Sequence, residues 1–367
     1  MNKPQRSVAL DAMRGLTLAA MILVNTPGSW SYLYPPLAHA DWHGYTPTDL
    51  IFPFFLFIVG AAMFFALRRF DYKPSGEALL KLGRRVAIIF AIGLFLQAFP
   101  FNSPLSELRI MGVLQRIALA YGLATLAVFY LSTRMLYLFM AVLLLGYWAM
   151  LYLVGVGNAF SVENNLVTVI DRALLGSEHL WRGKGVPFDP EGLLSTLPAT
   201  VNVLVGFVAT RAIMQMTSLN QQLRNLLVGG IVLLAVGHFW SVWLPINKSL
   251  WTSSFVLVTS GWALLVLAAF VALCRTSAGV RLAQPLRIYG MNPLFIYALS
   301  ALWVSCYFLI TLEFAGQPMN AYEYLYQLCL ALVANPYVAS LLFAGTHVLL
   351  FWGIAYILYR KDIFIKI

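Results

Sequence analysis

The chain is organised around one stretch, His39-Ala40-Asp41-Trp42-His43-Gly44-Tyr45-Thr46-Pro47-Thr48-Asp49-Leu50-Ile51-Phe52-Pro53. It brings two histidines, two aspartates and a tryptophan together immediately before a long run of apolar residues. Ionisable groups are costly to bury in a bilayer, so a polar cluster where a hydrophobic helix enters the membrane indicates a functional site. We therefore expect the chemistry of this protein at one lipid–water boundary.

The composition indicates a polytopic membrane protein. Of the 367 residues, 61% are hydrophobic and only 10% are charged, whereas an ordinary soluble domain carries about a quarter charged residues. The formal charge of +10 would suggest nucleic acid as a partner of a soluble chain. In a membrane protein, however, basic residues gather in the cytoplasmic loops. We therefore predict a lipid bilayer and no nucleic acid as its surroundings.

The apolar runs predict an all-α protein with about ten transmembrane helices, because each helix needs about 20 apolar residues to cross the bilayer. We expect one transmembrane domain over residues 1–367. The expected spans are 11–30, 47–67, 82–99, 112–131, 135–156, 193–213, 224–245, 251–274, 286–310 and 336–358.

The basic residues predict the orientation. An even number of spans places both termini on one side, and most Lys and Arg residues fall on that side, so we expect cytoplasmic termini. Within the last outer loop, residues 322–332 fit an amphipathic helix on the membrane surface. The expected outer loops are about 31–46, 100–111, 157–192 and 311–335.

His39 is the first candidate for chemistry. An imidazole titrates near pH 6.5, so it can take a proton from an amine at neutral pH. Asp41 and Asp49 lie nearby in the sequence, and Trp42 could form an apolar wall for a substrate. His43 could be the acting imidazole instead, and the sequence barely separates the two.

Asn25 is the second candidate, since it sits where the first span reaches the outer surface. Its amide could polarise a carbonyl as an oxyanion-hole donor. The following Thr26-Pro27-Gly28 fits simple helix termination equally well. Asp49 lies at the start of the second span, where a carboxylate is also favoured by the helix dipole.

Other polar residues lie within or beside the apolar segments and must meet one another or a ligand, because unpartnered polar groups are costly there. Asp11 and Arg14 are three residues apart on one helix face and can pair with each other. Cys274, Cys306 and Cys329 show no spacing typical of a disulfide framework or a zinc site, and we predict no metal. The remaining polar candidates are Gln115, Arg116 and Asn292.

Several short blocks resemble the heparan-α-glucosaminide N-acetyltransferase family. They occur in order over almost the whole chain, and together they form a specific signal. The blocks are Leu10-Asp11-Ala12-Met13-Arg14-Gly15, Val24-Asn25, the His39–Pro53 stretch, Arg109-Ile110-Met111-Gly112-Val113-Leu114-Gln115-Arg116, Asp171-Arg172, Asp189-Pro190-Glu191-Gly192, Pro245-Ile246-Asn247-Lys248-Ser249-Leu250-Trp251, Gly290-Met291-Asn292 and Ala355-Tyr356-Ile357-Leu358-Tyr359-Arg360-Lys361.

The resemblance implies transfer of acetyl from cytoplasmic acetyl-CoA to an amino sugar on the other side of the membrane. It implies that His39 is the catalytic histidine and Asn25 its partner, in a homodimer with acetyl-CoA in a tunnel through the bundle. The amine would attack the thioester directly, or His39 would first carry the acetyl group. We expect the acceptor near Trp42, His43, Asp49, Asp189, Glu191 and Asn292, and coenzyme A near Asp11, Arg14, Arg84, Arg85, Gln115, Arg116, Arg281 and Arg287.

The chain departs from the family pattern at His43, where the lysosomal enzyme has asparagine. Together with a longer spacing from Asn25 to His39 and a shorter 157–192 loop, this favours a small amino sugar or a cell-wall fragment over a polymeric acceptor. We expect a multi-pass protein of a bacterial inner membrane. Two other functions fit the same features. Buried polar groups among ten spans also describe an amino-sugar permease, and an O-acyltransferase of cell-surface glycans would need similar residues.

Overall fold

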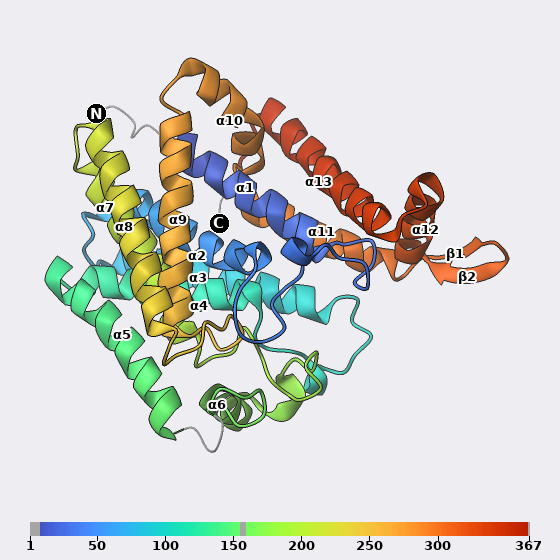
Figure 1. Ribbon diagram of the computed structural model, residues 1–367, viewed down its shortest axis with the longest axis horizontal. Helices are drawn as coiled ribbons and strands as arrows, with labels where there is room; N and C mark the ends of the chain where they lie inside the picture. Colours follow the sequence, from blue (N-terminus) through green and yellow to red (C-terminus); the bar gives the residue numbers. More distant parts are fainter. Residues whose placement is uncertain (1–7, 155–158, 366–367) are drawn as a thin grey trace.

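The structure, a computed structural model, describes residues 8–154 and 159–365. In these ranges the chain is mainly helical (Figure 1). Short 3₁₀ helices precede α2 at Pro47–Leu50 and follow α6 at Ser177–His179. The α-helices are α1 (Val8–Asn25), α2 (Ile51–Leu67), α3 (Gly76–Ala98), α4 (Val113–Tyr130), α5 (Thr133–Val154), α6 (Leu166–Leu175), α7 (Thr196–Met214), α8 (Leu219–Trp240), α9 (Ser253–Leu273), α10 (Ser277–Tyr289), α11 (Pro293–Tyr307), α12 (Ala321–Val333) and α13 (Pro336–Arg360).

The helices confirm an all-α, multi-pass membrane protein. In the described ranges, eight of them are long and apolar enough to cross a membrane, and the bent pair of α10 and α11 would add a ninth. We expected about ten. The expected span 82–99 falls on α3, whose first half carries Lys81, Arg84 and Arg85. These three side chains make α3 less apolar than its length suggests, and charged groups are costly in hydrocarbon. α3 is therefore not among the eight.

The expected continuous span 286–310 is instead broken. α10 and α11 are bent by 55° at the break. Gly290 lies against α1, where a Cβ atom would come within 2.2 Å of the Asp11 carbonyl oxygen. Pro293 opens α11, and proline disfavours a helical residue before it and supplies no N–H. These two residues end one helix and start the next.

The expected outer loops contain regular structure. Strands β1 (Thr311–Phe314) and β2 (Gln317–Asn320) form an antiparallel hairpin that projects beside α12 at the right of Figure 1. The amphipathic helix expected over 322–332 is present as α12. Helix α6 and a 3₁₀ turn occupy part of the expected loop 157–192, of which residues 157 and 158 lie outside the described ranges.

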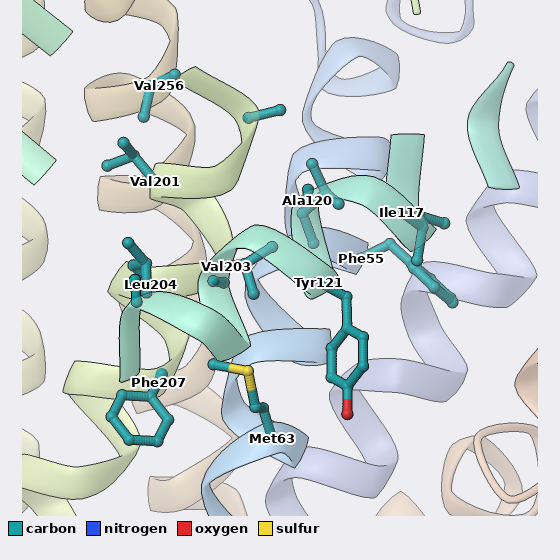
Figure 2. Packing of buried hydrophobic residues seen from close by; sticks show 14 of the residues in the cluster. Phe55, Met63, Ile117, Ala120, Tyr121, Val201, Val203, Leu204, Phe207 and Val256 are labelled. Atoms are coloured by element: carbon teal, nitrogen blue, oxygen red, sulfur yellow. The ribbon is translucent and has the colours of Figure 1, made fainter. Parts of the chain in front are cut away.

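A close contact between α2 and α7 anchors the centre of the bundle. A Cβ atom at Gly60 would lie 1.8 Å from the Val203 carbonyl oxygen, and one at Gly206 would lie 1.9 Å from the Phe57 carbonyl oxygen. Small residues of this kind let transmembrane helices approach each other closely. Buried residues of α2, α4, α7 and α9 pack around this contact, as Figure 2 shows.

The bundle has two ends with different contents. At one end, the break between α10 and α11 joins α1 to the segment after α13, since Arg14 donates to the Gly290 carbonyl and Asn292 donates to the Ile363 carbonyl. We call this end the terminus face. The opposite end, the loop face, collects the connections 26–50, 99–112, 159–195 and 241–252. Two backbone hydrogen bonds join these loops, from Gly44 to Ile246 and from Ile110 to His179.

Candidate active site

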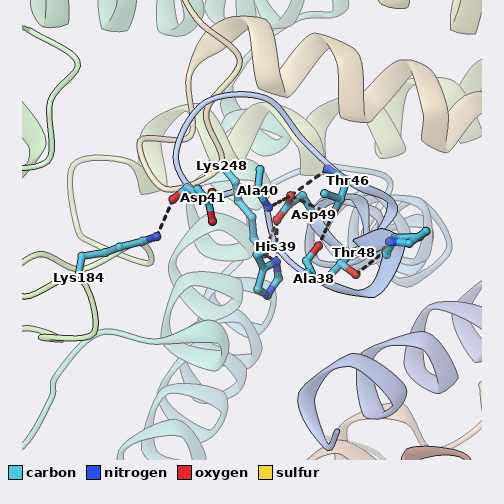
Figure 3. A network of polar contacts seen from close by, with 10 residues as sticks. Ala38, His39, Ala40, Asp41, Thr46, Thr48, Asp49, Lys184 and Lys248 are labelled. Atoms are coloured by element: carbon cyan, nitrogen blue, oxygen red, sulfur yellow. Dashed lines mark hydrogen bonds and ion pairs between the residues drawn. The ribbon is translucent and has the colours of Figure 1, made fainter. Parts of the chain in front are cut away.

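The polar stretch before α2 folds back onto the start of that helix. Thr46 and Asp49 form a capping box, in which the Thr46 amide donates to Asp49 Oδ2 at 3.0 Å. The Thr46 hydroxyl donates to the Ala38 carbonyl oxygen at 2.6 Å, and the Ala40 amide donates to Asp49 Oδ2 at 3.0 Å. The carboxylate of Asp49 is therefore buried with its oxygens bonded, and His39 is held beside it (Figure 3).

His39 pairs with Asp49 through one ring nitrogen. Its Nδ1 lies 2.7 Å from Asp49 Oδ1, with 45% of the His39 side chain exposed and 1% of Asp49. The other nitrogen, Nε2, makes no hydrogen bond within the described residues. A carboxylate that accepts Nδ1–H fixes the tautomer in which Nε2 carries the lone pair. This arrangement suits a general base.

Lys248 completes this group from a distant part of the chain. Its Nζ lies 3.1 Å from His39 Nδ1 and 3.3 Å from Asp49 Oδ1. Asn247, its neighbour, donates to the Trp42 carbonyl oxygen at 2.9 Å. The loop 241–252 is thus bound to the His39 loop along its length. In the sequence, Lys248 stands within the block Pro245–Trp251, and no local pattern there indicates a role for it.

The other residues of the opening stretch form the wall of this site. Trp42 donates to the Phe160 carbonyl oxygen at 2.7 Å and packs edge-on against Phe188, with 5.6 Å between the ring centroids. His43 Nδ1 lies 3.4 Å from Asn247 Nδ2. Burial lowers the pKa of His43. Since His43 faces an amide and not a carboxylate, the geometry favours His39 as the base.

An ion-pair cluster lies elsewhere on the loop face. Arg109 binds Asp189 through two bonds, at 2.8 and 2.7 Å, and binds Glu191 at 2.7 Å. Burial acts to raise the pKa of Glu191, but Arg109 and nearby basic groups lower it overall. Asp189 is fully buried with both oxygens on Arg109. It is thus placed to hold a loop together, and its expected contact with the acceptor stays a prediction.

Gln115 and Arg116 are buried in the first turn of α4. The Arg116 guanidinium lies 4.8 Å from the centroid of the Trp251 ring and donates to the Gly192 carbonyl oxygen at 3.1 Å. Both residues are on the loop face, whereas the basic residues expected to bind the nucleotide are elsewhere. The structure therefore separates Gln115 and Arg116 from the other expected coenzyme A contacts.

Asn25 is the last residue of α1, at the loop-face end of that helix. Its side chain is exposed and makes no hydrogen bond within the described residues. The structure thus places Asn25 and His39 on the same face without joining them by a hydrogen bond. A role for Asn25 toward a bound carbonyl stays a prediction.

The terminus face holds most of the expected coenzyme A residues. Arg14 pairs with Asp11 at 2.8 Å, and Arg85 lies 4.7 Å from the centroid of the Tyr121 ring. Arg287 donates to Gln284 at 3.3 Å. Arg84 and Arg281 are exposed on the surface.

Asn292, which we expected to bind the acceptor, also lies at the terminus face. Its side chain donates to the Ile363 carbonyl oxygen at 3.0 Å and accepts from the Ile365 amide at 2.8 Å. These bonds tie Asn292 to the backbone of the last described residues. Its expected role in acceptor binding stays a prediction.

A cavity of about 940 Å³ lies between α1, α2, α3, α4 and α11. Asp11, Arg14 and Arg85 line its end near the terminus face, and apolar residues such as Phe55 and Leu114 line the part nearer the loop face. His39, Asp49 and Lys248 are not among its lining residues in the described chain. The cavity covers much of the depth of the bundle, and it stops short of His39.

Comparisons with known proteins find similarity to one family. A family model described as "Heparan-alpha-glucosaminide N-acetyltransferase, catalytic" matches residues 6–171, which include the whole His39 stretch. The human heparan-alpha-glucosaminide N-acetyltransferase is 27% identical over 354 residues, covering 80% of this chain and 52% of that protein. The mouse protein of the same name is 25% identical, with 78% and 52% coverage. The chain thus spans about half the length of these relatives.

Proposed function

We propose that this chain, whose residues 6–171 match the heparan-alpha-glucosaminide N-acetyltransferase family model, transfers an acetyl group from acetyl-CoA to the amine of an amino sugar. The observation that carries this proposal is the pairing of His39 with buried Asp49, which leaves Nε2 unbonded on the loop face. We further propose that the terminus face is cytoplasmic, that the protein is a homodimer, and that it resides in a bacterial inner membrane.

The cavity supports a route for the donor. Basic residues at the terminus face would meet the phosphates of coenzyme A, since Arg side chains suit phosphate recognition. The apolar walls between Ala66 and Phe55 would surround the thin pantetheine arm. The nucleotide would then stay on one side while the thioester approaches the loop face. The last part of this route must open further, because His39 does not line the cavity.

In the proposed reaction, the amine nitrogen attacks the thioester carbonyl carbon, and the C–N bond forms as the C–S bond breaks. His39 Nε2 takes the proton that the nitrogen loses and passes it to the departing thiolate. Asp49 stabilises the imidazolium that forms in between. Asn25 would donate to the carbonyl oxygen as negative charge develops there. The products are an N-acetylated sugar and free coenzyme A.

The first test is an assay of the purified protein in nanodiscs with acetyl-CoA and glucosamine. We expect N-acetylglucosamine and an equal amount of free thiol. His39→Ala should lower kcat about 10²–10⁴-fold, the usual contribution of a general base. His238→Ala is the matched control, since His238 is an exposed histidine that bonds to Tyr45 and touches neither Asp49 nor Lys248. Full turnover by His39→Ala would overturn the assignment.

The second test blocks the cavity. Ala62 lines it, and a tryptophan there would fill the space between α2 and its neighbours. We expect Ala62→Trp to raise the apparent Kd for acetyl-CoA while leaving glucosamine binding unchanged. Ala141→Trp, on the exposed side of α5, is the control. Equal acetyl-CoA binding by both variants would exclude the cavity as the donor route.

A further inference from the structure

We propose that Lys248 is a positioning residue that keeps the imidazole of His39 unprotonated at neutral pH by offsetting the charge of Asp49. The inference rests on the proposed function in one respect, that His39 acts as a base. It assigns a separate task to a residue from a loop far away in the sequence. The geometry of three atoms carries it: His39 Nδ1, Asp49 Oδ1 and Lys248 Nζ.

The positions of the protons decide which atoms of this trio can bond. The 2.7 Å contact between His39 Nδ1 and Asp49 Oδ1 requires a proton on Nδ1, because the carboxylate can only accept. Lys248 also carries only donors, so it cannot bond to a protonated Nδ1. Its partner in the group is then Asp49 Oδ1, at 3.3 Å. The ammonium and the imidazole thus share one carboxylate oxygen.

The charges of Asp49 and Lys248 act on the His39 ring in opposite directions. A carboxylate beside an imidazole favours the imidazolium, which cannot act as a base. A cation at 3.1 Å from the same ring opposes this effect. Lys248 therefore lets Asp49 orient the ring without keeping it protonated. The neutral ring, with its lone pair on Nε2, is the form that accepts a proton.

Lys248 is held in place by its ionic partners and by its loop. Burial lowers the pKa of the Lys248 amine overall, although the charges of Asp49 and Glu191 act to raise it. The contact of Nζ with Asp49 Oδ1 at 3.3 Å gives the ammonium its partner. The backbone on either side is fixed, since Asn247 bonds to Trp42 and to Thr252. The hydrogen bonds of its loop thus hold Lys248 beside Asp49.

Other charged groups lie near this trio, and Arg116 is close enough to act on Lys248 electrostatically. His43, two residues after Asp41, faces the Asn247 amide. Lys184 binds the backbone carbonyl of Asp41 at 2.6 Å and not its carboxylate. The charged and titratable groups of the surrounding elements are Asp41, His43, Asp49, Arg116, Lys184, Glu191 and Lys248.

A simpler role for Lys248 would be to neutralise a buried carboxylate for stability alone. Asp49 keeps bonds from Ala40, Thr46 and His39 when the lysine is removed, so Lys248→Met should still fold. The two roles differ in their pH dependence. A purely structural lysine changes the rate at every pH, whereas the proposed one shifts the profile along the pH axis.

The first measurement is the pH profile of kcat for three variants. Two unit charges about 4 Å apart interact by about 1 kcal/mol even in bulk water, which corresponds to a shift of about one pH unit or slightly less. We expect Lys248→Met to move the acidic half-maximum upward by that amount and to recover most of its rate at high pH. Lys248→Arg should restore the original profile. Lys184→Met is the matched control and should not move it.

The second measurement does not depend on turnover. Diethyl pyrocarbonate modifies only the unprotonated imidazole, and peptide mass spectrometry can follow His39 separately from the other histidines. We expect the modification of His39 to require a higher pH in Lys248→Met, by the same amount. Thermal unfolding of each variant checks that the fold is retained.

The two measurements separate the possible failures. If His39 modification shifts as expected but no acetyl transfer occurs, the proposed function is wrong and the role of Lys248 stands. If neither the modification nor the rate profile moves in a folded Lys248→Met variant, the inference is overturned. A uniform loss of rate with an unmoved modification profile would also overturn it, in favour of a structural ion pair.

Discussion

The ion-pair cluster on the loop face leads to a stability prediction. Arg109 makes three hydrogen bonds to two carboxylates, at 2.8, 2.7 and 2.7 Å. The Arg109 side chain is 22% exposed, and that of Asp189 is fully buried. Arg109→Met removes the cation and leaves the Asp189 charge without its bidentate partner. Removing one partner of a buried pair costs about 3–5 kcal/mol, because the remaining charge stays desolvated.

The assay is thermal unfolding in detergent, followed by tryptophan fluorescence. One kcal/mol shifts Tm by about 2–4 °C in domains of 150–250 residues, so we expect Arg109→Met to lower Tm by roughly 5–10 °C in this longer chain. Arg109→Met combined with Asp189→Asn should recover part of the loss, since the amide is neutral. Arg182→Met is the control, because Arg182 is exposed in the same loop.

The pH dependence of this effect has a definite sign. The folded-state pKa of Glu191 is depressed below its ordinary value of 4.5. A depressed acid contributes stability that is present above its unfolded pKa and is lost as the pH falls through the folded value. The gap between wild type and Arg109→Met should therefore narrow in acid. A Tm for Arg109→Met within a degree of wild type at neutral pH would refute the reasoning.

Two further predictions concern single side chains. Burial raises the pKa of Asp171 to about 6, and its Oδ2 has no hydrogen-bond partner within the described residues, so ionisation above pH 6 destabilises the fold. Asp171→Asn should raise Tm above that of wild type at pH 7.5, and this gain should narrow as the pH falls from about 6 toward 3.8. The same Tm difference between variant and wild type at pH 7.5 and at pH 3.8 would contradict this. Gly60→Leu should separate α2 from α7, because even a Cβ there meets the Val203 carbonyl oxygen at 1.8 Å. We expect a large loss of Tm, measured against Gly353→Leu, where a Cβ meets nothing within 4 Å.

The class of fold and the location of the site could be predicted from the sequence because both depend on local signals. Apolar runs mark membrane helices wherever they fold. The His39 stretch, from Thr46 to Asp49 in particular, folds on itself through short-range hydrogen bonds. The break at Gly290 also had a local signal in Pro293, which a search for long apolar runs passed over.

The partners of these residues could not be predicted, because they come from distant parts of the chain. Lys248 reaches His39 across 209 positions, and Arg109 reaches Asp189 across 80. The hydrophobic periodicity of a sequence carries no information about such long-range pairs. Asn292 looked like a buried polar residue in need of a ligand, and its need is met by the backbone at Ile363 and Ile365.

The glycine contacts also determine which walls of the cavity can give way. α2 is locked to α7 through Gly60 and Gly206, and α1 is locked to α10 through Gly290. Gly93 of α3 meets only the end of the flexible Gln115 side chain of α4, at 2.4 Å, and α11 contains no glycine. We therefore expect widening for a bulkier acyl group to come from α3 and α11. The size of donor that this protein accepts is then set by how far these two helices part, and not by α1 and α2.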